Sequence, residues 1–192
     1  MIRETLLMET EEDPMASIPA GSQYVAMGSS FGAGPGLTPR APGSPRRAGR
    51  SASNYAHLVA RALALDLRDV TYSGATTDDI LRPSARGLPA QLDAVTPATR
   101  LVTLTGGGND VGYLPRLTLA SLPWPLRILP KARAQIAGYV AASAASADHH
   151  AWAATPWTRR FHLSLRGGAP YHPNAAGMAA VADLVLTTLE TG

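Results

Sequence analysis

Short apolar runs that end in small polar residues recur along the chain. Residues 23–28 (QYVAMG) are apolar with a β-branched member and are followed by GSS, so they predict a buried strand. Residues 68–74 (RDVTYSG) predict a second strand that ends at a glycine. Residues 99–110 (TRLVTLTGGGND) predict a third strand, again running into glycines. Three strands therefore end in the same kind of sequence.

Helical periodicity separates these strands. The stretch SNYAHLVARALAL, residues 53–65, has an apolar face, and Ser53 or Asn54 is placed to cap it, so it predicts an amphipathic helix. Residues 75–81 and 88–95 predict two shorter helices, the first with acidic residues in its first turn.

The C-terminal stretch predicts one more helix. Asn174 is a plausible N-cap, and Met178, Val181, Val185 and Leu189 then share one face. Alternating strands and helices are typical of a parallel α/β sheet, in which ligands bind at the carboxyl ends of the strands. The motifs GSS, SGATT and GGGND should therefore meet at one edge of the sheet.

Length and composition fit a single domain that is large enough to bury a core. The 192 residues suit one folded unit over 21–192, preceded by a flexible leader over 1–20. There are no cysteines, which excludes disulfides and a thiolate nucleophile. No apolar run approaches the roughly 18 residues of a membrane span, so we expect no stable membrane insertion. The acidic start lacks the apolar segment of a signal peptide, and a cytoplasmic location is expected.

The net charge of +3 comes mostly from arginine. Four arginines lie in the Pro/Gly/Ser-rich segment 35–52, namely Arg40, Arg46, Arg47 and Arg50. Nucleic-acid binding is the sharper interpretation, but no aromatic residues interleave with these side chains. We therefore expect a solvated basic loop and no nucleic-acid partner.

The polar residues at the strand ends could support nucleophilic chemistry. A serine hydroxyl needs a base to take its proton and donors for the oxyanion that forms. Ser29 and Ser30 offer hydroxyls, and His172 precedes the last helix in a loop. Asn109 offers an amide donor and Gly74 a backbone N–H with no side chain in the way.

The motifs GSSFGAG, SGATT, GGGND and HPNAAG, in this order, resemble the four blocks of the SGNH/GDSL hydrolases. That resemblance implies a three-layer, flavodoxin-like α/β sandwich. It also implies ester hydrolysis, with Ser30 as nucleophile and His172 as general base. The implied oxyanion donors are the N–H groups of Ser30 and Gly74 and the side chain of Asn109.

The chain departs from the family pattern in two places near the site. Ser29 replaces the aspartate of the GDS triplet, a side chain that supports the loop in the family. Ala169 stands where the family has the acidic residue three positions before the histidine. We therefore expect the Ala169 carbonyl to orient His172, giving a Ser–His dyad.

The middle of the chain is shorter than the resemblance leads us to expect. A fourth parallel strand is implied near residues 114–138, which contain four prolines and no clear strand. We expect this strand to be missing, with residues 137–145 pairing beside the third strand or leaving a gap. The apolar stretch LASLPWPLRIL within it suits a lid over an acyl chain or the scar of a deletion.

No cofactor or metal is expected. Asp148, His149 and His150 could suggest a metal site, but adjacent histidines diverge on any regular element, so a surface role is favoured. The predicted function is hydrolysis of a small-molecule or lipid ester, with an acetylated sugar or a thioester as rival substrates. The rival outside enzymes is a catalytically impaired remnant that binds a ligand or has no activity. The sequence sets no oligomeric state.

Overall fold

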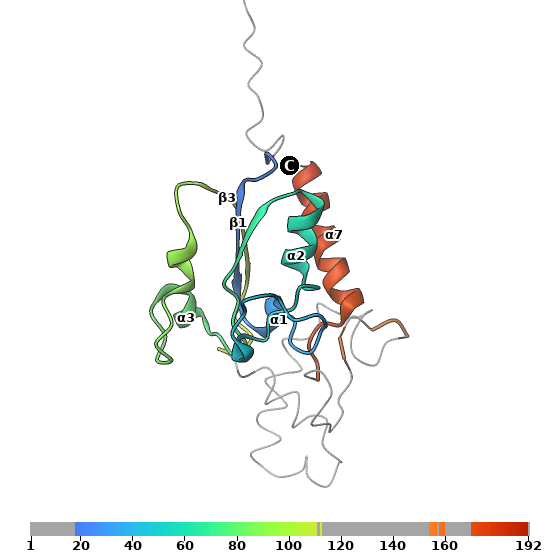
Figure 1. Ribbon diagram of the computed structural model, residues 1–192. Coiled ribbons are helices and arrows are strands. Elements are labelled where there is room, and N and C mark those ends of the chain that lie inside the picture. Colours follow the sequence, from blue (N-terminus) through green and yellow to red (C-terminus); the bar gives the residue numbers. More distant parts are fainter. Residues whose placement is uncertain (1–17, 111, 113–153, 157, 160–169, 192) are drawn as a thin grey trace, which may run out of the picture.

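In the part of the chain that the structure describes, a three-stranded parallel sheet lies between layers of helices (Figure 1). The computed structural model describes residues 18–110, 112, 154–156, 158–159 and 170–191. Its strands are β1 (Gln23–Gly28), β2 (Asp66–Asp69) and β3 (Thr99–Thr105), in the order β2-β1-β3. Both neighbours of β1 run parallel to it, as the alternation of elements predicted.

Helices cover both faces of the sheet (Figure 1). Helices α2 (Tyr55–Ala62) and α7 (Ala175–Thr191) pack together on one face. The short helix α3 (Thr77–Leu81) and the 3-10 turn η2 (Gln91–Ala94) lie on the other. This three-layer α/β arrangement is the predicted fold class.

The central strand is buried because both of its faces meet helices. Tyr24 and Ala26 point into the core shared with α2 and α7. Val25 and Met27 point to the opposite side and pack with Ile80. Alternate residues of a strand face opposite sides, and a parallel strand covered on both sides is therefore apolar throughout.

The helix caps follow the sequence. The Asn54 side chain accepts a hydrogen bond from the His57 N–H at 3.0 Å and so begins α2. Asn174 Oδ1 accepts from the Gly177 N–H at 2.9 Å at the start of α7. Thr76 forms a reciprocal capping box with Asp79 at the start of α3.

The predicted second strand, 68–74, is wrong in its boundaries, because β2 ends at Asp69. The Asp69 carboxylate accepts a hydrogen bond from the Thr71 N–H, which interrupts the regular hydrogen-bond ladder between β1 and β2. The chain nevertheless stays beside β1 for three more residues, with the Tyr72 N–H donating to the Gly28 carbonyl at 2.9 Å. The chain thus follows the edge of the sheet as far as Tyr72, two residues before Gly74.

Other differences from the sequence-based expectation concern short turns. Residues 88–95 form only the 3-10 turn η2. The expected loop 35–52 contains a second 3-10 turn, η1 (Arg46–Ala48). A four-residue helix, α1 (Ser30–Ala33), follows β1 and was not predicted. The expected gap or replacement strand near 114–145 lies outside the described residues.

None of the helices in the described part of the chain combines the length and apolar character needed to cross a membrane.

Helix α7 is held to the core by buried side chains, so its packing can be tested. Met178 is fully buried in the cluster with Tyr24 and α2, whereas Leu184 on the same helix is 67% exposed. Met178→Ala should lower the free energy of unfolding by about 2–5 kcal/mol because it leaves a cavity. Leu184→Ala should change it by less than about 0.5 kcal/mol. Urea denaturation measures both, and equal effects would contradict the described packing.

Candidate active site

The turn after β1 is set by a close approach to the end of β3. Gly28 has φ +134°, and a Cβ there would lie 2.1 Å from the Thr105 carbonyl oxygen. Only glycine fits such a position. The Ser29 N–H then donates to the same Thr105 carbonyl at 2.8 Å. The chain turns at once into α1, which places Ser30 at the first position of that helix.

Ser30 and His172 meet at this turn. The distance between Ser30 Oγ and His172 Nε2 is 2.7 Å, although 142 residues separate them in the sequence. Both residues are only 4% exposed. The Phe31 ring packs against the imidazole with 5.3 Å between ring centroids. A buried hydroxyl and imidazole at hydrogen-bonding distance have the geometry of a nucleophile and its base.

The second nitrogen of His172 contacts a main-chain carbonyl. His172 Nδ1 lies 2.9 Å from the carbonyl oxygen of Pro170, not of Ala169 as expected. Tyr171 has φ +60°, and this left-handed residue turns the Pro170 carbonyl back toward the ring. Ala169 itself lies outside the described residues. The assignment of the orienting carbonyl therefore moves to Pro170.

Burial is the main influence on the charge of His172. Desolvation lowers the pKa of His172, and the positive charge of Arg159 lowers it further, against an opposing effect of the hydrogen bond with Pro170. The ring is therefore neutral at pH 7. With Nδ1–H donating to Pro170, Nε2 carries the lone pair that accepts the Ser30 proton.

Gly74 and Asn109 are brought together by the loops that follow the other two strands. Asn109 Nδ2 donates to the Ala75 carbonyl at 2.7 Å, directly beside Gly74. The next residue, Asp110, accepts from the Thr77 N–H at 3.0 Å. These bonds join the two loops into one unit at the carboxyl edge of the sheet.

A hollow of about 400 Å³ opens beside the Ser30 turn. The residues that line it come from the turn after β1 and from the end of β3 with its following loop, namely Ser29, Phe31, Leu104, Thr105, Gly106 and Gly108. Leu104 is more than half exposed there. An apolar group of a ligand bound at Ser30 has room in this hollow.

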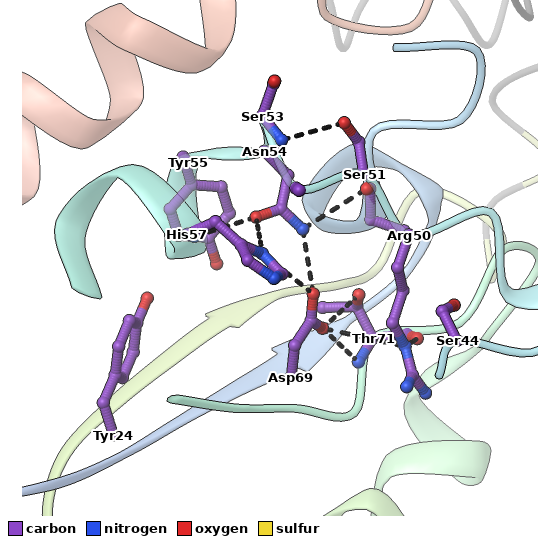
Figure 2. A network of polar contacts seen from close by, with 12 residues as sticks. Tyr24, Ser44, Arg50, Ser51, Ser53, Asn54, Tyr55, His57, Asp69 and Thr71 are labelled. Atoms are coloured by element: carbon purple, nitrogen blue, oxygen red, sulfur yellow. Dashed lines mark hydrogen bonds and ion pairs between the residues drawn. The ribbon is translucent and has the colours of Figure 1, made fainter. Parts of the chain in front are cut away.

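The Asp69 carboxylate, whose side chain is buried, lies at the centre of a network of polar contacts (Figure 2). Asp69 accepts from Asn54 Nδ2 at 2.9 Å and from the Thr71 N–H and hydroxyl at 3.0 and 2.6 Å. Arg50 Nε lies 3.8 Å and His57 Nδ1 3.7 Å from the carboxylate. Burial lowers the pKa of His57 despite the nearby carboxylate, so Arg50 is the cation that faces Asp69.

The same network reaches the end of α1. Asn54 Nδ2 also lies 3.3 Å from the Ala33 carbonyl, which accepts from the Ser51 N–H at 2.9 Å as well. Asn54 thus links the start of α2 to the helix that carries Ser30. Arg50 belongs to this network with its side chain 19% exposed, so the expectation of a solvated basic loop is wrong for Arg50.

Within the described residues, no group of three or more His, Cys, Asp or Glu side chains could hold a metal ion. The Asp148, His149 and His150 group lies outside them.

A comparison with known protein families identifies the family of this chain. The profile of the GDSL-like lipase/acylhydrolase family matches residues 26–123, about half of the chain. The chain belongs to this family. The GDSL match includes the Ser30 turn, Gly74 and Asn109, whereas His172 lies beyond it.

One curated protein and two solved structures are similar to this chain, over different fractions of its length. "Lipase 2" of Streptomyces coelicolor is 45% identical over 87 residues, which are 45% of this chain and 29% of that protein. The chain thus spans less than a third of this relative. Two solved structures show the same fold, each with a TM-score of 0.62: a phospholipase A1 of Streptomyces albidoflavus and an extracellular lipase of Streptomyces rimosus. They are 20% and 23% identical, over 88% and 87% of this chain and 99% of each of theirs.

Sequence reasoning singled out Ser30, Gly74, Asn109 and His172. The structure brings Ser30 to His172 and joins the loop of Asn109 to that of Gly74. The residues that support these four were missed. Nothing in the sequence pattern pointed to Asp69 as a buried carboxylate, since its strand also carries the exposed Asp66. Pro170 was missed because the turn at Tyr171 has a backbone conformation that non-glycine residues rarely adopt.

The Asp69 network should contribute measurably to stability. Asp69→Asn puts an amide NH₂ group beside the Asn54 and Thr71 groups that donate to the carboxylate, and it removes the charge that faces Arg50. The free energy of unfolding should therefore fall by about 2–4 kcal/mol. The matched variant Asp66→Asn changes an exposed carboxylate on the same strand and should cost less than about 0.5 kcal/mol. Both are measured by urea denaturation at pH 7. A near-neutral Asp69→Asn would show that the network carries little stability.

Proposed function

We propose that the protein is a serine hydrolase that cleaves carboxylic esters with a Ser30–His172 dyad. The observation that carries this proposal is the 2.7 Å contact between Ser30 Oγ and His172 Nε2 in a buried setting. Membership in the GDSL-like lipase/acylhydrolase family supports the same reaction class.

The proposed reaction has two stages. Ser30 Oγ attacks the ester carbonyl carbon while His172 Nε2 takes the hydroxyl proton, and a tetrahedral oxyanion forms. The oxyanion collapses, the bond to the alkoxy oxygen breaks, and His172 gives its proton to the leaving alcohol. A water molecule then attacks the acyl-Ser30 ester with His172 again as base, which releases the acid and restores the serine.

His172 would act without a carboxylate partner. The Pro170 carbonyl holds the Nδ1–H tautomer, which leaves Nε2 free to accept the proton. A carbonyl dipole stabilises the imidazolium less than a full negative charge does. The dyad therefore depends more heavily on alignment and on the oxyanion donors.

The proposed oxyanion donors are the N–H groups of Ser30 and Gly74 and the side chain of Asn109. Ser30 opens α1, and first-turn N–H groups have no acceptor within their own helix. Asn109 uses one amide N–H to bind the Ala75 carbonyl, and a primary amide has a second one. The hydrogen bond to the Ala75 carbonyl would hold the Asn109 amide in place and so fix the direction of its second N–H.

The hollow beside Ser30 favours an ester with an apolar acyl group. Phe31 and Leu104 contribute apolar surface to this hollow. None of the lining residues listed above carries a charged side chain. "Lipase 2" of Streptomyces coelicolor carries a name that fits such a substrate. The proposed substrates are thus small-molecule or lipid esters.

Nucleophile identity can be tested with two neighbouring serines. Ser30→Ala should abolish release of p-nitrophenol from short-chain esters and labelling by a fluorophosphonate probe, because the attacking oxygen is gone. Ser29→Ala should still be labelled, since the hydroxyl in contact with His172 is that of Ser30. Activity that survives in Ser30→Ala would reassign the nucleophile. A folded wild-type protein with neither activity nor labelling would favour the impaired remnant.

The oxyanion role of Asn109 predicts a loss in rate without a loss in binding. Asn109→Ala should lower kcat by about 10²–10³-fold with little change in KM, because the donor acts on charge that develops in the transition state. Steady-state kinetics on a p-nitrophenyl ester measures both constants. Asp110→Ala is the control for the loop: it removes the bond to Thr77 and should lower kcat far less. Equal losses in the two variants would assign the effect to loop anchoring.

A further inference from the structure

The loop that carries His172 is held by a separate chain segment. The Arg159 N–H donates to the His172 carbonyl at 3.0 Å, and the Tyr171 N–H donates to the Arg159 carbonyl at 2.9 Å. Thr158 and Pro173 form an antiparallel bridge at the same place. Two backbone bonds and a bridge make residue 159 the direct neighbour of the catalytic loop.

The side chain of Arg159 reaches the other half of the site. Its Nη1 donates to the Pro35 carbonyl at 2.8 Å. Pro35 follows α1 by two residues, just after the left-handed Gly34 that ends this helix. One residue therefore bonds to the loop of His172 through its backbone and, through its guanidinium, to the turn that ends the helix carrying Ser30.

We propose that Arg159 is a positioning residue for the dyad: it links the His172 loop to the turn that follows α1, the helix that begins with Ser30. The inference rests on the proposed function, because positioning has a meaning only where Ser30 and His172 react. It goes beyond that function in assigning a role to a side chain outside the four family motifs.

The segment around Arg159 is itself anchored. Asn174 Nδ2 donates to the Pro156 carbonyl at 2.7 Å, while Asn174 Oδ1 caps α7. The start of α7 therefore holds one end of this segment and the His172 loop holds the other. Through the hydrogen bond from the Arg159 guanidinium to the Pro35 carbonyl, this anchored segment also holds the turn after α1.

Arg159 also influences the charge of the base. The groups described around the His172 ring are the Ser30 hydroxyl, the Phe31 ring, the Pro170 carbonyl and Arg159. No carboxylate in the described ranges forms an ion pair with His172, and the charged group that acts on its pKa is Arg159. A guanidinium stays protonated in proteins. Its charge opposes protonation of the ring and keeps His172 neutral to lower pH.

The hydrogen bond of Arg159 and its charge should affect the kinetics differently, and three variants of Arg159 separate the two effects. Arg159→Met removes both the hydrogen bond and the charge, Arg159→Gln keeps an amide donor without charge, and Arg159→Lys keeps the charge on a different geometry. A neutral His172 is required as base, so activity falls as pH drops through its pKa. Loss of the cation should raise that pKa and move the acid limb of kcat/KM to higher pH.

The expected results follow from these differences. Arg159→Met should lower the plateau of kcat/KM on the order of 10–100-fold, the scale of a small misplacement of reacting groups, and should shift the acid limb upward. Arg159→Gln should show the shift with a smaller loss at the plateau. Arg159→Lys should keep the limb in place. Arg61→Met is the matched control, because Arg61 Nη1 also donates to a carbonyl, that of Ala52 at 2.9 Å, on the exposed side of α2.

A second measurement does not depend on activity. NMR titration of the five histidines, with His172 assigned through a His172→Gln variant, should give a higher pKa for His172 in Arg159→Met and Arg159→Gln than in wild type. Arg159→Lys and Arg61→Met should not move it. If the wild type hydrolyses no ester, the proposed function fails while this titration still reports the effect of Arg159 on His172.

Two outcomes overturn the proposal. One is a folded Arg159→Met protein with the wild-type plateau of kcat/KM and the wild-type acid limb. The other is an equal loss of activity in Arg159→Met and Arg61→Met, which would indicate a general effect of losing an arginine. If Arg159→Met does not fold, Arg159→Gln carries the test, since an unchanged limb and an unchanged titration in that variant contradict it as well.

Discussion

The site depends on how closely the end of β1 approaches the end of β3. At Gly28 the two backbones leave no room for a Cβ, and the Ser29 N–H bonds directly to the Thr105 carbonyl. This contact fixes where the strand stops and where α1 begins. Ser30 therefore takes its position from the pairing of two parallel strands.

The two halves of the dyad are supported in different ways. The Ser30 side is backed by a buried network in which Asp69 and Asn54 join β2, α2 and the end of α1 (Figure 2). Among the described residues, the His172 loop bonds through its main chain to Arg159, whose guanidinium donates to the Pro35 carbonyl.

The sequence indicated the parallel α/β sheet, the edge of the sheet that carries the site, the cap at Asn174 and a cap at Ser53 or Asn54, because each follows from local composition. It did not indicate that Asp69 is buried or that Arg50 lies beside it, since both facts depend on which loop covers the end of β2. The shift from Ala169 to Pro170 has a similar cause. Which carbonyl faces a ring depends on one backbone angle at Tyr171, and spacing alone does not determine that angle.

A base oriented by a carbonyl and placed near an arginine has a definite chemical consequence. In a site with a carboxylate, the negative charge stabilises imidazolium and raises the pKa of the histidine. Here burial and Arg159 act in the opposite direction and lower it. In the proposed reaction this keeps the base unprotonated under mildly acidic conditions, but it makes the charged intermediate state of His172 less stable. The oxyanion donors and the alignment of Ser30 must therefore supply a larger share of transition-state stabilisation than they would beside a buried aspartate.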